Sequence, residues 1–390
     1  MSKNSRKIVK RKIVSSIQFL DEDLWSTITQ NENIYLSYSY LSALEDTIKE
    51  EIDFYYSISF DDQNNPVLAA SFQVVHFSDK KKRKNSFHNT YCLIKNKILS
   101  FNILVCGNVF SDGENGFLFT DSVSKKEAII ELSIITEEIK AISKKNKKKL
   151  PVVLFKEFWA KEDTYTKSFK KQSFREFMID VNMVLPIHES WNNLDDYLFS
   201  LKTKYRTRAK SVYKKSKELV FRNLNKEEIE EYNSEIKTLF NNVVDNATFS
   251  LVALNSMAFV KFKEALNEQF IFKAAFLEDK MVGFCTSFFH NNILEANYVG
   301  IDYELNHDKS IYQRLLYEYV ETALELNAKE LQLGRTSELI KSAIGAVPEN
   351  MKLYAKHRST IPNLLLKPAF HFISPSKFEL RQPFKTEYAL

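Results

Sequence analysis

Polar and titratable side chains crowd around two glycines near the end of the sequence. Gly334 lies between a short apolar segment and Arg335, and Lys341 and Gly345 follow in the same stretch. In a chain with only 7 glycines, these two positions indicate a positive backbone φ or the close approach of another group. The planar guanidinium of Arg335 suits bidentate binding of a carboxylate or phosphate, and an ion pair at a strand end is the alternative.

A second concentration of charge lies in the middle of the chain. Its basic residues are Lys202, Lys204, Arg206, Arg208, Lys210, Lys214, Lys215 and Lys217. On one exposed surface, these cations would bind the phosphates of tRNA, coenzyme A or an anionic lipid. A solvated helix face is the plain alternative. Tyr205 and Tyr213 fall on the apolar side of this stretch, so we expect them in the core rather than stacked on bases.

Motifs for several common reaction classes are absent. The sequence has no P-loop, no G-x-G-x-x-G, no G-x-S-x-G and no H-E-x-x-H, so P-loop hydrolysis, serine hydrolysis and zinc peptidase chemistry lack their usual support. Cys92, Cys106 and Cys285 are scattered without ligand spacing. We therefore expect no disulfide framework, no metal site and a reducing cytoplasm. The net charge of +5 is too small for a whole-protein field that binds DNA.

Membrane contact is expected only at the surface. No apolar run reaches the roughly 18 residues of a membrane-spanning helix. Residues 1–14 are basic without a following apolar region, so we expect no signal peptide. With the apolar stretch 364–373, this basic segment would allow the protein to rest on an anionic membrane. A stretch broken by proline is, however, more often a packed terminal strand.

The elements that position these residues follow one order in both halves. In each half, a hairpin is followed by a third strand, an amphipathic helix and a short strand. In the first half we expect them at 54–60, 67–77, 98–109, 124–142 and 150–155. In the second half we expect them at 270–276, 281–289, 293–303, 310–326 and 330–333. For 390 residues, the pattern predicts two α+β domains.

A basic amphipathic helix is expected between the halves, at residues 194–220. Asn193 is its expected N-cap, and Asp195 and Asp196 fall in the first turn, where the helix dipole favours acidic side chains. Further helices are expected at 226–242 and 256–267.

These motifs resemble the acyltransferase domains of the GNAT superfamily. The resemblance rests on Tyr298-Val299-Gly300-Ile301-Asp302, on Tyr312 to Glu318, on Leu333-Gly334-Arg335, on Lys341 with Gly345, and on Tyr354 to His357. More narrowly, the chain is similar to the FemAB-like branch, in which two such domains stand in tandem. The segment from Tyr197 to Arg206 resembles the entry to the second of them.

The resemblance implies a fold class and a domain division. The expected fold is α+β, with two tandem GNAT-like domains that each have a mixed, mostly antiparallel sheet flanked by helices. We expect a basic segment at 1–14, a first domain at 15–190, and a second domain at 191–390 that carries the active site and is entered through the basic helix.

The resemblance also implies transfer of an acyl group from a thioester, or of an aminoacyl group from tRNA, to a primary amine. The donor would lie along a strand at Tyr298, Val299 and Gly300. Its pyrophosphate would bind at the start of the next helix, aided by Lys309 and Arg314. The segment 304–310 lacks the glycines usual at that position, which speaks against an ordinary acetyltransferase more than against the FemAB-like branch.

The acid and base of such a transfer are expected from the same half. Glu295 is the first choice for the base and His290 the second, and an exposed strand carboxylate is the alternative for Glu295. The resemblance places Tyr354 where a tyrosine protonates the leaving thiolate, with packing of its ring in the core as the alternative. It also suggests His357 as an acid or base and Lys341, with Arg335, as a partner of an anionic substrate group.

The sequence thus predicts a bacterial N-acyltransferase of the cytoplasm, with peripheral contact at the inner membrane face. Acyl-CoA or an acyl carrier protein would be the co-substrate, no cofactor would be tightly bound, and the amine acceptor could be lipid-like. One alternative is a tRNA-dependent aminoacyl transferase that acts on a cell-wall precursor. The other is a FemAB-like binding protein without catalytic activity.

Overall fold

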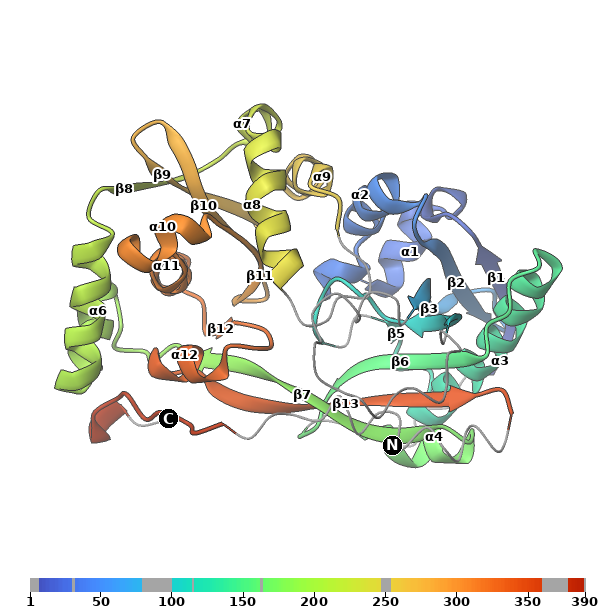
Figure 1. The fold of residues 1–390 in the computed structure, drawn as a ribbon. Helices are drawn as coiled ribbons and strands as arrows, with labels where there is room; N and C mark the ends of the chain where they lie inside the picture. Colours follow the sequence, from blue (N-terminus) through green and yellow to red (C-terminus); the bar gives the residue numbers. More distant parts are fainter. Residues whose placement is uncertain are drawn as a thin grey trace, which may run out of the picture. The chain divides into compact units, whose positions relative to one another are not determined.

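The structure of the chain is a computed structural model that describes residues 7–29, 32–78, 100–113, 116–161, 164–246, 254–359 and 378–388. The chain forms two compact units. The first takes in Met1–Ile179, Ala247–Leu254 and Met351–Ser374, and the second takes in Asp180–Asn246, Asn255–Asn350 and Pro375–Leu390. Each unit is described by itself below (Figure 1).

The first unit alternates strands with helices along the chain. Its elements are β1 (Ile8–Val14), η1 (Ile17–Phe19), α1 (Glu22–Thr29), η2 (Ile34–Leu36), α2 (Tyr38–Ile48), β2 (Asp53–Asp61), β3 (Pro66–Ser78), β4 (Ser100–Cys106), β5 (Phe117–Phe119), α3 (Lys125–Lys145), β6 (Val152–Trp159), α4 (Thr166–Lys171) and the start of β7 (Arg175–Pro186).

The sheet of the first unit runs in the order β1-β2-β3-β4-β6, and residues 351–357 pair beside β6. All of these pairs are antiparallel except β4 with β6. The apolar side of α3 packs against one face of the sheet in a core that includes Ile129, Leu132 and Phe72. On the other face, Trp25 of α1 contacts the ring of Tyr56 edge to face. The unit is therefore a sheet covered by helices on both faces.

The second unit repeats this order. After the end of β7 come α5 (Leu194–Ser200), α6 (Thr203–Lys215), β8 (Leu219–Asn223), α7 (Lys226–Glu231), α8 (Asn233–Asn246), α9 (Met257–Leu266), η4 (Asn267–Gln269), β9 (Phe270–Leu277), β10 (Lys280–His290), β11 (Ile293–Ile301), α10 (Tyr303–Lys309), α11 (Ile311–Glu325), β12 (Glu330–Gln332), α12 (Glu338–Ala343), the start of β13 (Val347–His357) and η6 (Thr386–Tyr388).

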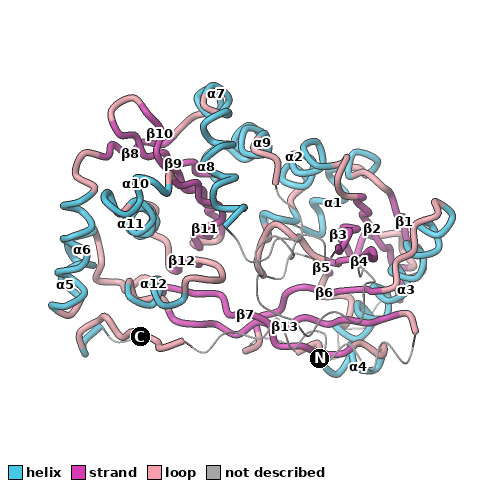
Figure 2. The backbone as a smooth tube through the Cα atoms, viewed as in Figure 1, coloured by secondary structure: helices cyan, strands magenta, loops and turns pink. Residues whose placement is uncertain are grey.

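The sheet of the second unit runs β8-β9-β10-β11-β12-β7, and only β11 and β12 are parallel to each other. Helix α11 packs Leu315 and Val320 against one face, in a core with Leu294. Helices α8 and α9 cover the other face, where Phe240 and Phe259 contact the ring of Tyr298. Figure 2 shows α8 and α11 on either side of these strands.

Most of the expected elements are present near their predicted positions. Both hairpins form, as β2–β3 and β9–β10. Ser124 caps α3 in a reciprocal capping box with Glu127, as the sequence pattern favours. Gly334 and Gly345 both have positive φ, at 71° and 103°. A Cβ on Gly345 would also lie 2.2 Å from the ring of Phe384, so both expected reasons for a glycine hold there.

The single helix expected at 194–220 is wrong. The chain instead forms α5, α6 and β8 in succession. Leu201 adopts an extended conformation, is fully buried and forms a β-bridge with Phe384. The Lys202 N–H donates to the carbonyl of Pro383. Contacts with a distant segment thus interrupt a sequence whose local pattern is helical throughout.

The second part of the expected basic segment at 1–14 belongs to the sheet of the first unit. Residues 8–14 form β1 and pair with β2. The guanidinium of Arg11 binds both carboxylate oxygens of Glu131, at 2.7 and 2.9 Å, and an oxygen of Glu138 at 2.7 Å. This arginine therefore holds a strand to α3. Residues 1–6, Cys92 and the stretch 364–373 lie outside the described residues.

Candidate active site

The two residues predicted as bases meet at the end of the β10–β11 hairpin. Asn291 and Asn292 both have positive φ, as a tight two-residue hairpin turn requires. This turn sets the register in which His290 faces Ile293 and Phe288 faces Glu295. Diagonal neighbours on one face of a hairpin are in contact range. Accordingly, His290 Nε2 lies 2.7 Å from Glu295 Oε1.

The His290–Glu295 pair lies on the face of the sheet that α8 and α9 cover. Residues opposite each other in neighbouring strands point to the same side. Glu295 is opposite Phe288, whose ring packs on Phe262 of α9 at 5.6 Å between centroids. The side chains of His290 and Glu295 are 10% and 14% exposed. Both groups are thus shielded from bulk water without being sealed from it.

Next to this pair, the two parallel strands of the sheet diverge. β12 pairs with β11 only from Ile293 to Glu295. β11 continues along residues 296–301 beside β10, whereas β12 ends at Gln332. The edge of β11 that follows Glu295 therefore leaves its parallel neighbour. Such a divergence gives an extended ligand a strand edge along which to lie.

The residues predicted to hold the donor along β11 have clear packing roles. The ring of Tyr298 lies between α8 and α9. The backbone N–H of Tyr298 donates to Thr286 Oγ1 at 3.1 Å. Val299 is opposite Cys285 in the sheet. A Cβ on Gly300 would lie 2.0 Å from the ring of Phe284, so this glycine is needed for close packing.

The two cations predicted to bind a pyrophosphate are engaged by protein groups. Lys309 donates to a carboxylate oxygen of Glu218. Arg314 lies 2.6 Å from Glu318 and 3.1 Å from Glu321. The start of α11 is similarly occupied, because the Tyr312 N–H donates to Asn306 Oδ1 at 2.8 Å. Helix α10 supplies that asparagine. This helix takes the place of the glycine-rich loop that the resemblance led us to expect there.

On the side of the sheet that α11 covers, Arg314 belongs to a buried polar network. Its guanidinium lies 4.1 Å from the ring centre of Tyr213 and 4.7 Å from that of Phe221. Lys273 of β9 binds Glu318 at 3.1 Å. Burial raises the pKa of the Glu318 carboxyl despite these two cations. We therefore interpret Arg314, which the sequence suggested as a residue that binds the donor, as a structural residue of this network.

The loop after β12 is held by Lys341. Its ammonium donates to the carbonyls of Gly334 and Arg335, at 3.3 and 2.5 Å, and the residue is 5% exposed. Thr336 and Ser337 both have positive φ, at 61° and 55°. Non-glycine residues adopt this conformation only where the surroundings impose it. Lys341 therefore fixes the strand-end loop that carries Arg335.

Tyr354 and His357 belong to the first unit. The Tyr354 ring is fully buried and stacks on Phe169 at 4.1 Å, and its hydroxyl lies 2.6 Å from Thr166 Oγ1. This packing matches the alternative that the sequence left open for Tyr354. His357 is half-buried, and its Nδ1 accepts the Ser359 N–H at 3.0 Å. Neither residue belongs to the same compact unit as Glu295.

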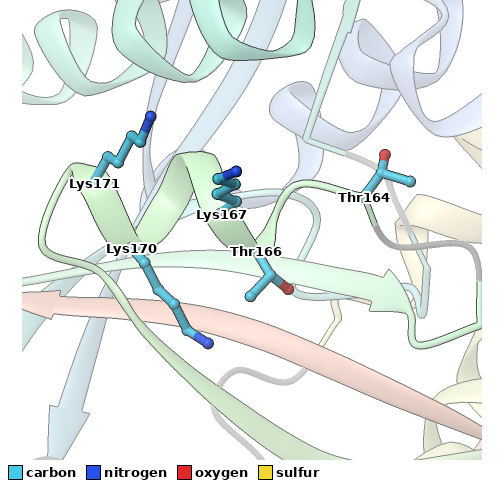
Figure 3. Close-up of a pocket in the computed structure, with 5 residues that line it drawn as sticks. All are labelled: Thr164, Thr166, Lys167, Lys170 and Lys171. Carbon is cyan, nitrogen blue, oxygen red and sulfur yellow. The ribbon is translucent and has the colours of Figure 1, made fainter.

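A cavity of about 600 Å³ in the first unit was not predicted from the sequence. Thr164, Thr166, Lys167, Lys170 and Lys171 line it. In Figure 3, Lys167 and Lys171 extend to one side of α4 while Thr166 and Lys170 extend to the other. The polar groups therefore do not converge on one point. The lining has no carboxylate and no imidazole, so it offers no acid–base pair.

Other chemistries find little support in the part of the chain that the structure describes. Burial raises the pKa of the Cys285 thiol to about 12, which keeps it protonated at neutral pH. Among the described residues, no cluster of three histidine, cysteine or acidic side chains could hold a metal ion. Within these same residues, no helix is long and apolar enough to cross a bilayer.

Comparison with known proteins gives structural likeness without sequence likeness. No family model matches the chain, and no curated protein matches it. The structure of L-PGS from Bacillus licheniformis matches with a TM-score of 0.52 and 10% identity, over 91% of this chain and 97% of that one.

Two further solved structures resemble the chain to the same degree. The C-terminal domain of a protein described as a lysylphosphatidylglycerol synthetase, from Agrobacterium fabrum, matches with a TM-score of 0.51 and 9% identity, over 92% of this chain and 98% of that one. FemX matches with a TM-score of 0.51 and 11% identity, over 94% of this chain and 100% of that one. At these identities the likeness establishes the fold over nearly the whole length.

Proposed function

Because the chain has the tandem GNAT-like fold of the FemAB-type branch, we propose that it is a transferase that moves an acyl or aminoacyl group to an amine. The reaction would take place in the second unit. One observation carries this proposal: the His290–Glu295 pair stands where β11 parts from β12. A strand edge for the donor and a base for the acceptor therefore lie side by side.

The pair has the chemistry that amine acylation needs. A primary amine is protonated at neutral pH and must lose a proton before it attacks a carbonyl carbon. Glu295 accepts that proton, and His290 orients the carboxylate through its contact at 2.7 Å. The amine nitrogen then bonds to the acyl carbon, and the bond to the leaving sulfur or oxygen breaks. The attacking nitrogen gives up a second proton as the amide forms. Of the two protons that the nitrogen loses, one passes to the leaving sulfur or oxygen and the other is released to water, so charge and atoms balance.

The first candidate donor is a thioester of coenzyme A or of an acyl carrier protein. Its acyl arm would run along residues 296–301, past Tyr298, Val299 and Gly300. Lys309, Arg314 and the start of α11 already contact other groups of the protein. These contacts argue against binding of a coenzyme A pyrophosphate at that helix. An acyl carrier protein does not present its phosphate in the same way, so we favour it over free coenzyme A.

A specific observation favours aminoacyl-tRNA as the second candidate donor. Helix α6 contains no acidic residue. Its Lys204, Arg208, Lys210, Lys214 and Lys215 are all exposed. Tyr205 and Ala209 face the core instead. A basic face without exposed apolar side chains suits the phosphate backbone of a nucleic acid better than insertion into a bilayer.

The acceptor is proposed to be an amine on a lipid or on a cell-wall precursor. The name of one similar structure includes lysylphosphatidylglycerol, which supports a lipid more than a precursor. Phosphatidylglycerol itself offers hydroxyl groups, so this support is for the lipid and not for the amine. A cytoplasmic protein that touches the anionic inner membrane surface would reach such an acceptor. Electrostatic attraction to the lysines of α6 would suffice for this contact.

The decisive experiment compares Glu295→Gln with Glu235→Gln, which changes an exposed carboxylate of α8 in the same unit. Purified protein is offered acyl carrier protein thioesters, acyl-CoA and aminoacyl-tRNA with amine acceptors. For a general base, we expect Glu295→Gln to lower turnover by about 10²–10⁴. The control should keep full turnover. Equal activity of both variants with a confirmed donor would refute the assignment of the base.

A further inference from the structure

The two units carry two copies of the same parallel strand pair. In the second unit it is β11 with β12, and in the first it is β4 with β6. Each pair follows an antiparallel hairpin, β9–β10 or β2–β3, and encloses a crossover helix, α11 or α3. The proposed donor groove beside β11 therefore has a structural counterpart beside β4.

The counterpart differs because its strand is interrupted. β11 is one continuous strand from Ile293 to Ile301, although its register against β10 shifts between Ala296 and Val299. In the first unit, β3 pairs with β4 along residues 72–78 and with β5 along residues 68–70. Ser71 lies between these pairings, and it accepts the Gly107 N–H and donates to the Gly116 carbonyl. β4 and β5 are thus two halves of one strand, and the chain leaves the sheet between them.

The described part of this excursion, Gly107–Gly113, crosses to β6, and we term it the filling segment. β4 and β6 pair as far as Cys106 and Phe155. Directly after that point, the Glu157 N–H donates to the carbonyl of Gly113 at 3.1 Å. The Lys156 ammonium donates to the carbonyl of Ser111 at 3.0 Å. The filling segment thus bonds to β6 where the parallel strands begin to part.

Side chains on the opposite side fix the filling segment in place. The Val109 N–H donates to Gln73 Oε1 at 2.8 Å. The Asn108 amide donates to the Tyr40 hydroxyl at 2.7 Å, and Asn108 is buried. Gly107 has a φ of 131°, and a Cβ there would lie 2.6 Å from the carbonyl oxygen of Lys156. Such close backbone packing leaves no room for a ligand at this point.

We infer that the donor groove of the first unit is filled by the protein's own segment Gly107–Gly113, so that the chain binds one donor, along β11. This inference rests on the proposed function. The first unit would then have the fold of a donor-binding domain without binding a donor. The same hydrogen-bonding edge that would hold a donor in one copy of the fold holds protein backbone in the other.

Two measurements test this inference. Native mass spectrometry at saturating acyl carrier protein thioester, acyl-CoA or aminoacyl-tRNA counts the donors bound to each chain. Hydrogen exchange with and without the bound donor locates it. We expect one donor per chain and new protection confined to residues 296–301. Two donors, or new protection at β5 and β6, would overturn the inference.

Hydrogen exchange of the free protein separates this inference from the proposed function. The amides of Val109 and Glu157, which bond to Gln73 and Gly113, should exchange slowly without any donor. If they exchange as fast as an open loop, the groove is not filled, whatever the protein binds. If they are slow and no donor binds at all, the proposed function fails while the filled groove stands.

Discussion

Replacement of Lys273 by methionine should destabilise the second unit in a manner that depends on pH. Lys273 lies 3.1 Å from Glu318, and the two side chains are 10% and 4% exposed. Loss of one partner from a buried ion pair costs about 3–5 kcal/mol. Arg314 remains 2.6 Å from the other side of the same carboxylate. We therefore expect a loss near the lower limit, about 3 kcal/mol.

The sign of the pH dependence follows from the pKa of Glu318. Burial raises this pKa, and Lys273 lowers it again in part. When the pKa of a carboxyl is higher in the folded protein than in the unfolded chain, the free energy of unfolding falls as pH rises through the folded-state pKa. Without Lys273 the pKa rises further. The penalty of Lys273→Met should therefore be largest in alkali and shrink in acid, where Glu318 is protonated in both states.

Urea unfolding at about pH 4 and at about pH 8, just below and far above the ordinary glutamate pKa of about 4.3, checks this prediction. The matched control is Lys280→Met, which removes a pair with Asp302 at 2.9 Å whose lysine is 68% exposed. It should cost less than about 1 kcal/mol. The double variant Lys273→Met, Glu318→Gln should recover part of the loss. Equal losses for Lys273→Met and Lys280→Met, or a penalty independent of pH, would refute the reasoning.

Three further outcomes are expected. Lys341→Met removes the ammonium that donates to the carbonyls of Gly334 and Arg335, while the Gly334 carbonyl keeps the N–H of Met183. We expect a loss of about 1–3 kcal/mol in the free energy of unfolding and a lower kcat, both measured against Lys341→Arg. An unchanged kcat would show that the loop has no part in the reaction. Tyr354→Phe keeps the stacking on Phe169 and loses the contact with Thr166. It should lower the free energy of unfolding in urea by about 1 kcal/mol and leave turnover unchanged. A large loss of turnover would instead support Tyr354 as the acid. Charge reversal at Lys214 and Lys215, exposed on α6, should weaken tRNA binding and reduce the salt slope by about 2. Thioester turnover with a water-soluble amine acceptor, which does not need the membrane contact, should stay the same. An unchanged slope in filter binding would exclude this face as the RNA contact.

Much of the fold could be predicted because its signals are local. Alternating apolar residues indicate the hairpins, and the helical spacing from Ala128 to Ile139 indicates α3. The order of these elements suffices to suggest two copies of one fold. The interruption at Leu201 could not be predicted, because the contact that imposes it comes from Phe384, far along the chain. Periodicity carries no information about such a partner.

The candidate site shows the same division. The sequence by itself indicated Glu295 and His290 as candidates for the base, from their places at the start of one strand and the end of the strand before it. The structure adds that the turn at Asn291 and Asn292 sets a register in which both side chains lie on one face. The sequence also determined that Gly334 and Gly345 need special backbone geometry. These are short-range constraints set by covalent geometry and hydrogen-bond register.

Only the tertiary structure decided which cations remain available to a ligand. Lys309 binds the carboxylate of Glu218 and Lys341 binds the carbonyl of Arg335, each on another segment of the chain. Arg314 instead pairs with Glu318 four residues on in its own helix, a contact that helical spacing already allows. It also decided that β11 parts from β12 while the filling segment bridges β4 and β6. The physical reason is that charge pairing and strand-edge occupancy depend on what lies within about 3 Å in space, whereas the sequence orders residues only along the chain.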